Sequence, residues 1–108
     1  MALQMKHDFS QEAGVWKVRV SGEVDVATAG GLRGLLADLF QEKQSDIVLD
    51  MSDLSYIDST GLGVLIGAYG RMQESGHGIR VEHPRENIAK LLRITSLDRI
   101  FCAAEQTE

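Results

Sequence analysis

The sequence predicts an α/β fold with an N-terminal β-hairpin, followed by helices and strands that alternate on one mixed sheet. Two runs of alternating apolar and polar residues stand within the first 21 positions, as in half-buried strands. Two segments with helical periodicity follow, over residues 32–40 and 62–72, on either side of a short apolar run. The chain has 108 residues, 44% of them hydrophobic, so we expect one domain over residues 1–108.

The hairpin is predicted from residues 3–10 and 16–21, which are joined by a turn over residues 11–14. In the first strand His7 falls on the apolar side of the alternation. We expect a partly buried structural histidine there rather than a metal ligand, because no second histidine or cysteine stands at ligand spacing. The apolar sides consist of Leu3, Met5, His7 and Phe9 in one strand and Trp16, Val18 and Val20 in the other.

The next element is predicted to be a helix whose apolar stripe is made of leucines and one phenylalanine. Gly22-Glu23-Val24-Asp25 closes the preceding strand. Either Asp25 or Thr28 can cap the helix, since both carry a side-chain oxygen that accepts from a free backbone N–H. The stripe is Leu32, Leu35, Leu36, Leu39 and Phe40.

A buried strand over residues 46–51 and a short loop lead to a second helix, in which Asp58, Ser59 and Thr60 all favour the N-cap. Open N–H groups and the helix dipole make such a start favourable for an anion, although on residue types alone a plain capped helix is the commoner case. The expected apolar stripe is Leu62, Leu65, Ile66, Tyr69 and Met72, with Val64 and Ala68 on the outer side.

Three glycines, Gly63, Gly67 and Gly70, fall on one face of this second helix, on the same side as Ser59. Each glycine within a helix costs about 0.8–1.0 kcal/mol relative to alanine, so the three cost roughly 2–3 kcal/mol. A helix that carries this penalty has a packing or binding reason for it. Either another element of the chain or a partner molecule approaches the face closely.

The C-terminal third is predicted to contain a strand over residues 78–82 and a short helix that begins near Pro84. Residues 96–99 are expected to form a turn, and residues 100–102 a closing edge strand. The polar residues 103–108 are expected to form a loose tail.

Composition disfavours several classes of function. The formal net charge is −5 and no basic stripe is visible, which disfavours nucleic-acid binding. The single cysteine, Cys102, excludes an internal disulfide and suits a reducing compartment. No apolar run reaches the roughly 20 residues of a membrane span, and no secretion leader precedes residue 10. We therefore expect a soluble, cytoplasmic protein that does not contact a membrane.

No catalytic, metal or cofactor site is expected. Ser59 has no base in an evident motif, because the three histidines are scattered along the chain. Asp53 and Asp58 alone supply too few oxygen ligands for a divalent cation. No Gly-Lys-Ser/Thr follows the glycines, so they do not form a phosphate-cradling loop.

The hexapeptide Asp58-Ser59-Thr60-Gly61-Leu62-Gly63, preceded by Leu49-Asp50-Met51-Ser52 and Ile57, resembles the signature of the STAS domain. It is most similar to that of the small bacterial anti-sigma factor antagonists, and the likeness covers nearly the whole chain. The resemblance implies that Ser59 is reversibly phosphorylated. It also implies that the unphosphorylated chain binds an anti-sigma factor, a serine kinase with a histidine-kinase-type ATPase fold, and thereby releases a sigma factor. A phosphatase would reverse the modification.

The resemblance further implies a contact surface at the start of the second helix, with the Asp25 loop beside it. Asp25 would orient the hydroxyl or touch the kinase, and Thr60 offers a second hydroxyl. The alternative is a STAS module that senses a nucleotide or lipid ligand, or joins a larger assembly, with Ser59 never modified. The expected contact residues are Asp25, Asp58, Ser59, Thr60, Gly61, Gly63 and Gly67.

Overall fold

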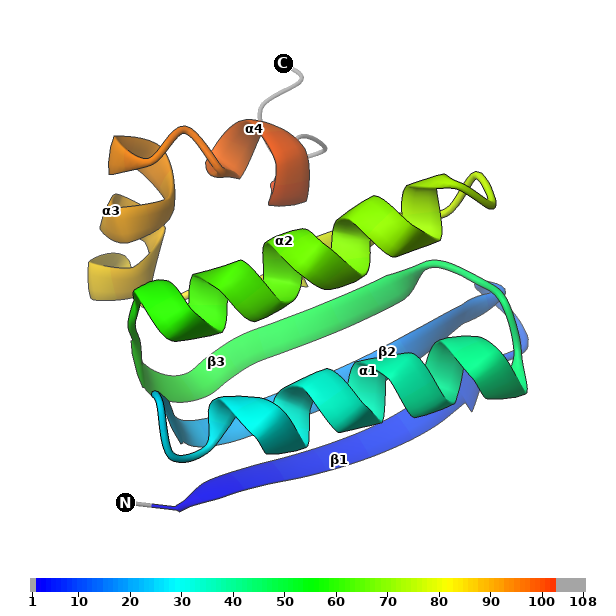
Figure 1. The fold of residues 1–108 in the computed structure, drawn as a ribbon, viewed down its shortest axis with the longest axis horizontal. Helices are drawn as coiled ribbons and strands as arrows, with labels where there is room; N and C mark the ends of the chain where they lie inside the picture. Colours follow the sequence, from blue (N-terminus) through cyan, green and yellow to red (C-terminus); the bar gives the residue numbers. More distant parts are fainter. Residues whose placement is uncertain (1, 103–108) are drawn as a thin grey trace.

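The computed structural model describes residues 2–102 and confirms the predicted class, with four strands and four helices in one α/β unit (Figure 1). The loose tail predicted for residues 103–108 lies outside the described residues. The elements in chain order are β1 (Leu3–Ser10), β2 (Val15–Val24), α1 (Ala29–Glu42), β3 (Ile47–Ile57), α2 (Ser59–Gln73), β4 (Ile79–Glu82), α3 (Glu86–Ile94) and α4 (Asp98–Phe101).

The sheet is mixed and its strands follow chain order, β1-β2-β3-β4. β1 and β2 form the predicted antiparallel hairpin, whereas β3 runs parallel to both β2 and β4. Parallel neighbours need a crossover, and α1 and α2 provide the two crossovers. Both helices lie side by side on the same face of the sheet in Figure 1. The topology brings the end of β2, the end of β3 and the starts of both helices to one end of the molecule.

The core lies between the sheet and the helices, and it consists of the inward positions predicted from the alternation. Trp16, Val18 and Val20 are buried on β2, and Ile47 and Leu49 on β3. The opposite face of the sheet carries the charged residues of each strand, as expected for a sheet with one solvated side. These include Lys6, Asp8, Lys17, Arg19, Asp50, Arg80 and Glu82.

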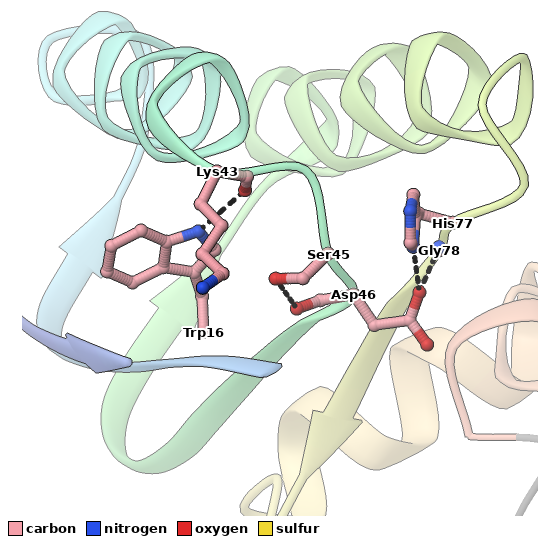
Figure 2. Close-up of polar contacts among 6 residues, drawn as sticks. All are labelled: Trp16, Lys43, Ser45, Asp46, His77 and Gly78. Carbon is pink, nitrogen blue, oxygen red and sulfur yellow. Dashed lines mark hydrogen bonds and ion pairs between the residues drawn. The ribbon is translucent and has the colours of Figure 1, made fainter. Parts of the chain in front are cut away.

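Polar contacts fasten the sheet at the end where β3 begins, opposite Ser59 (Figure 2). The indole Nε1–H of Trp16 donates to the Lys43 carbonyl at 3.0 Å, so the residue after α1 is held against β2. Asp46 Oδ1 accepts from the Gly78 N–H at 3.0 Å and lies 3.1 Å from His77 Nδ1. One carboxylate therefore joins the start of β3 to the segment before β4.

β3 is longer than predicted, since it runs to Ile57 rather than ending near residue 51. Two register shifts against β2 allow the continuation, and Gly22 occupies one of them with a φ of +99°. A Cβ at Gly22 would lie 2.1 Å from the Ala2 carbonyl oxygen, so the position requires glycine. Ser55 Oγ donates to the Gly22 carbonyl at 2.9 Å and holds the irregular segment together.

Two further predictions are wrong. Residues 100–102 are not a strand, because Asp98–Phe101 forms the short helix α4. The buried Phe101 ring and the Tyr69 ring make a T-shaped contact, with the two ring centroids 5.8 Å apart. A short apolar run does not distinguish a strand from a buried helical turn. His7 is exposed rather than partly buried, because β1 is an edge strand; its ring makes a T-shaped contact with the Trp16 ring, with the two centroids 6.1 Å apart.

The orientation of α2 also differs from the expected one. Val64 and Ala68, expected on the outer side, are buried, whereas Ile66 is exposed. The reason is that α2 packs against α1 as well as the sheet, so its buried face is wider and is rotated towards α1. The helix α1 matches its predicted stripe, with Leu32, Leu36 and Leu39 buried.

Asp50 on the open face of the sheet provides a test of pH dependence. Burial raises the pKa of Asp50, but hydrogen bonds from Ser52 and the charges of Arg19 and His83 outweigh burial and hold the pKa below its ordinary value of 3.8. A depressed pKa stabilises the fold above the unfolded-state value, and this contribution is lost as the pH falls through the folded-state value. Arg19 Nη2 lies 3.5 Å from Asp50 Oδ2.

We expect Asp50→Asn to lower the free energy of unfolding at pH 7 by about 0.5–1 kcal/mol. Asparagine keeps the acceptor for the Ser52 N–H, at 3.0 Å from Oδ1 in the wild type, and removes only the charge. The difference should shrink as the pH falls below 3.8. Urea unfolding at several pH values measures it, and Asp53→Asn, at an exposed position of the same strand, is the control. A difference that is constant with pH would contradict this assignment.

Candidate functional site

The candidate site is formed where β3 gives way to α2, next to the loop between β2 and α1 (Figure 1). Val24 and Ile57 are paired across β2 and β3, and the Asp58 N–H donates to the Val24 carbonyl at 3.2 Å. The two loops are thus joined by the end of the sheet itself. The resemblance of the sequence to a known signature placed Asp25 and Asp58 in one site, and the structure brings their loops together.

Ser59 is the first residue of α2, and Asp58 is its N-cap. Asp58 Oδ1 accepts from the Gly61 N–H at 3.1 Å, which satisfies one of the free donors of the first turn. This leaves the two hydroxyls differently placed, because Ser59 is exposed and Thr60 is half-buried. The cap is therefore the aspartate, and the Ser59 hydroxyl faces solvent at the positive end of the helix dipole.

Gly61 has a packing role. A Cβ at this position would lie 2.6 Å from Ile57 Cγ1 and 2.7 Å from Val24 Cγ1, closer than side-chain carbons approach one another. The absence of a side chain lets the first turn of α2 rest directly on the ends of β2 and β3. Gly61 therefore sets how close Ser59 lies to the sheet. The expected contact of Gly61 with a partner stays a prediction.

Gly63, Gly67 and Gly70 lie on the outward side of α2, and two of them have open surroundings. A Cβ at Gly63 or Gly70 would meet no heavy atom within 4 Å. The nearest atom to a Cβ at Gly67 is the tip of the flexible Arg71 side chain, at 3.6 Å. Packing within residues 2–102 therefore does not require these glycines. The expected close approach by a partner stays a prediction.

Thr28 occupies the N-cap position of α1, but no side chain makes the predicted cap hydrogen bond to the helix; instead the Asp25 and Thr28 side chains lock the β2–α1 loop before it. Asp25 Oδ1 accepts from the N–H groups of Ala27 and Thr28, at 3.0 and 3.1 Å, and from Thr28 Oγ1 at 3.2 Å. Thr28 Oγ1 in turn accepts from the Asp25 N–H at 2.9 Å, and its single hydrogen is shared between the Glu23 carbonyl at 2.9 Å and the more distant Asp25 Oδ1. This is a local turn lock, and among the described residues it includes no hydrogen bond from Asp25 to Ser59.

The turn lock leads to a test of the Asp25 side chain. We expect Asp25→Asn to keep the fold, with a free energy of unfolding within about 0.5 kcal/mol of the wild type, because the amide oxygen still accepts from the turn. Asp25→Ala should cost about 1 kcal/mol or more, as the loss of a cap does. Thermal unfolding compares the two variants. Equal losses in both would show that the charge, not the oxygen acceptor, holds the loop.

Three large apolar side chains on the segments that form the site are exposed: Val26, Tyr56 and Ile66. They are 78%, 46% and 46% exposed. Tyr56 stands three residues before Ser59 and Ile66 seven after it, which places Ile66 on the same face of α2. Ile66 was expected in the buried stripe of α2, and its exposure follows from the packing of α2 against α1.

The site carries little charge of its own. No lysine or arginine occurs in residues 20–28 or 54–70, and the acidic residues there are Glu23, Asp25 and Asp58. Within the described part of the chain no three His, Cys, Asp or Glu side chains are grouped closely enough to hold a metal ion. What the arrangement offers is an exposed hydroxyl on a rigid helix start, next to the Asp58 carboxylate and the acidic β2–α1 loop.

Comparison with known families defines the class of protein. The STAS domain matches residues 8–108, and the chain belongs to this family. No helix of the described residues has the length and apolar character that a membrane crossing demands.

Individual relatives narrow the class. The chain is 34% identical to the "Anti-sigma-B factor antagonist" of Bacillus subtilis over 101 residues. The aligned residues cover 94% of this chain and 92% of the relative. A putative anti-sigma factor antagonist from Thermotoga maritima has the same fold, with a TM-score of 0.81 at 24% identity over 90% of this chain and 82% of that one. The structure of SpoIIAA from Bacillus in its phosphorylated form has a TM-score of 0.68 at 22% identity. The match covers 93% of this chain and 88% of that chain.

Proposed function

We propose that this protein is an anti-sigma factor antagonist whose unphosphorylated form binds an anti-sigma factor and so frees a sigma factor. The observation that carries the proposal is the exposed Ser59 hydroxyl, held at the start of α2 by the Asp58 cap. The similarity to the Bacillus subtilis antagonist over 94% of the chain supports it. The role needs a binding surface and a modifiable side chain, and no catalytic group of its own.

The partner in this proposal is itself a serine kinase with a histidine-kinase-type ATPase fold. It uses ATP to phosphorylate Ser59, which breaks the complex, and a phosphatase removes the phosphate. The exchange takes place in the cytoplasm, where sigma factors act. Ser59 is favoured over Thr60 as the acceptor because the threonine is half-buried in the first turn of α2.

Magnitudes explain how one phosphate acts as a switch. The modification adds about −1.5 to −2 charges to a chain whose formal net charge is −5. At a helix N-terminus the added charge is stabilised by about 0.3–1 kcal/mol, so the fold tolerates it. In a complex, the same dianion loses its water against a surface built for a neutral hydroxyl. The cost therefore falls on binding, and each 1.4 kcal/mol lowers the affinity tenfold.

A further prediction concerns the outward side of α2, where Gly63, Gly67 and Gly70 lie. Replacing Gly63 by glutamine should raise the free energy of unfolding by about 0.5 kcal/mol, because glutamine is the better helix former and the position is open. The same change should weaken binding of the anti-sigma factor at least tenfold by holding the partner away. Gly34→Gln in α1 is the matched control, since that position is also exposed and open. Equal affinities for both variants would remove the glycine face from the interface.

One observation favours the alternative, a STAS module that senses a small ligand. A hollow of about 430 Å³ lies on the open face of the sheet, within the size range of ligand sites. Its walls include Lys6, Lys17, Arg19, Asp50, Glu82 and His83. A thermal-shift screen with nucleotides and lipids tests it, because a ligand present at a hundred times its Kd adds about 2.7 kcal/mol of stability.

The experiment that tests the main proposal is direct binding. Each protein of the host that carries a histidine-kinase-type ATPase domain is purified and titrated with the unphosphorylated chain, with and without ATP. The proposal predicts that one of them binds, and that ATP dissolves the complex while phosphate appears on the antagonist. If none binds while a small ligand gives a shift, the sensing module is the correct function.

A further inference from the structure

We propose that Arg85 and Asn87, here called the α3 clamp, are positioning residues that hold the end of β3 and thereby set the place of Ser59 for its partner. The inference rests on the proposed function and extends it to two side chains outside the segments that form the site. Both residues act through the backbone of β3, and their role requires no contact with the partner.

The end of β3, residues 51–57, lacks regular strand pairing on both sides. β4 is paired only with residues 47–50 of β3, so in the part of the chain that the structure describes no strand continues beside residues 51–57 on that side. On the other side the pairing with β2 has two register shifts, both between residues 19 and 23. The carbonyl groups along such an edge need donors from elsewhere.

The α3 clamp supplies donors to this edge. Arg85 Nε donates to the Ser52 carbonyl at 3.0 Å, and Asn87 Nδ2 donates to the Ser55 carbonyl at 3.0 Å. The two side chains come from the N-cap and the first turn of α3, a helix whose apolar side is buried and which contacts β3 (Figure 1). The clamp therefore takes the place of the strand that β4 does not provide.

The turn between β4 and α3 brings the clamp to β3. His83 directly follows β4 and has a φ of 57°, in the left-handed region that few residues other than glycine adopt. Pro84 comes next and cannot donate a backbone hydrogen bond, so the strand ladder ends here. The chain leaves the sheet at this point, and side chains of α3 rather than strand backbone meet residues 51–57.

The held segment leads directly to the switch residue. Ser55 stands four residues before Ser59, and between them the Asp58 N–H donates to the Val24 carbonyl at 3.2 Å. A displacement of the Ser55 carbonyl is passed along this short stretch to the start of α2. The clamp thus keeps the Ser59 hydroxyl at a fixed place beside the β2–α1 loop, and such preorganisation raises affinity because less ordering is left to binding.

The test combines amide hydrogen exchange of the free protein with affinity for the host anti-sigma factor that binds the wild-type chain. Asn87→Ala should speed exchange of the Asp58 N–H at least about fivefold and weaken binding at least about threefold, as the loss of a hydrogen bond does. The Trp16 N–H, which donates to the Asp46 carbonyl at the opposite end of the sheet, should exchange as in the wild type. Asn87→Ala changes no charge, so electrostatics cannot explain a loss of affinity.

Two further variants show whether the hydrogen bond itself matters. Asn87→Gln keeps an amide donor and should restore exchange and affinity to within about twofold of the wild type. Tm should stay within about 3 °C of the wild type for both substitutions, since the position is exposed and alanine and glutamine are better helix formers than asparagine. Arg93→Ala is the matched control on the same helix, because Arg93 donates within α3, to Glu86 at 3.1 Å, and its loss should change neither readout.

The outcomes separate this inference from the function on which it rests. Wild-type exchange of the Asp58 N–H in both Asn87→Ala and Arg85→Ala would overturn the clamp. Faster exchange with wild-type affinity would also overturn it, and so would an equal acceleration at Trp16, which would show general destabilisation. If no anti-sigma factor binds the wild-type chain, the proposed function fails and the role of the clamp in binding fails with it, while the exchange of Asp58 still decides whether the clamp holds the end of β3.

Discussion

A Ser59→Asp variant is expected to fold as the wild type does and to lose its affinity for the anti-sigma factor by at least a hundredfold. The side chain at this position is exposed at the first turn of α2, where a negative charge is stabilised by the helix dipole. The fold therefore accepts the charge, and Tm should stay equal or rise slightly. In the complex the carboxylate is desolvated beside the Asp58 carboxylate, and about 2.7 kcal/mol of that cost is a hundredfold in affinity.

Ser59→Ala is the control for the aspartate variant. It removes the hydroxyl without adding charge, so it should bind the anti-sigma factor at close to wild-type affinity and should resist dissociation by ATP. Titration calorimetry of both variants against the same partner gives the comparison. An aspartate variant that binds as tightly as the wild type would refute the electrostatic switch at this residue.

The second large effect is on stability: Gly61→Ala should lower the free energy of unfolding by about 2–3 kcal/mol. The added methyl group would stand 2.6 Å from Ile57 Cγ1 and 2.7 Å from Val24 Cγ1, and both side chains are buried at the end of the sheet. Relief requires α2 to move away from the ends of β2 and β3, and overpacking of this kind costs about 1–3 kcal/mol. The gain in helix propensity, about 0.8–1.0 kcal/mol, does not offset a displacement of the whole first turn.

Gly63→Ala provides the matched control for Gly61→Ala in the same helix. Its Cβ would meet no neighbour, so the propensity gain acts alone and the variant should be more stable than the wild type. Urea unfolding of the two variants, compared at their midpoints, measures both effects. If both alanines stabilise the protein, then α2 does not rest on the sheet as the structure shows.

Local patterns in the sequence were sufficient for the hairpin, for α1 and for the strand–loop–helix arrangement around Ser59. They were insufficient where tertiary packing decides the outcome. The length of β3 depends on bulges against β2 and on the positive φ of Gly22, and neither alters the apolar pattern of β3 itself. The rotation of α2 depends on α1 beside it, which buries Val64 and leaves Ile66 in solvent. The apolar residues 100–102 fit a helical turn as well as a strand.

The candidate site also has features that the sequence predicted and features that only the structure reveals. A cap at the start of α2 follows from residue types, because a cap acts within one turn of a helix, but three candidates were open and the structure assigns the cap to Asp58. Asp25 was expected either to cap or to serve the site directly, and only coordinates distinguish a carboxylate held by Ala27 and Thr28 from one aimed at Ser59. The exposure of Ile66 was missed because it depends on how α2 packs against α1.

The most direct measurement of the central claim is intact-mass and peptide mass spectrometry on the protein purified from its native host with phosphatase inhibitors present. The account predicts a single phosphate localised to Ser59, in a fraction that varies with growth condition. It further predicts that the anti-sigma factor copurifies only with the unmodified fraction. Phosphate on Thr60 alone would move the switch by one residue. A chain that carries no phosphate under any growth condition would contradict the account.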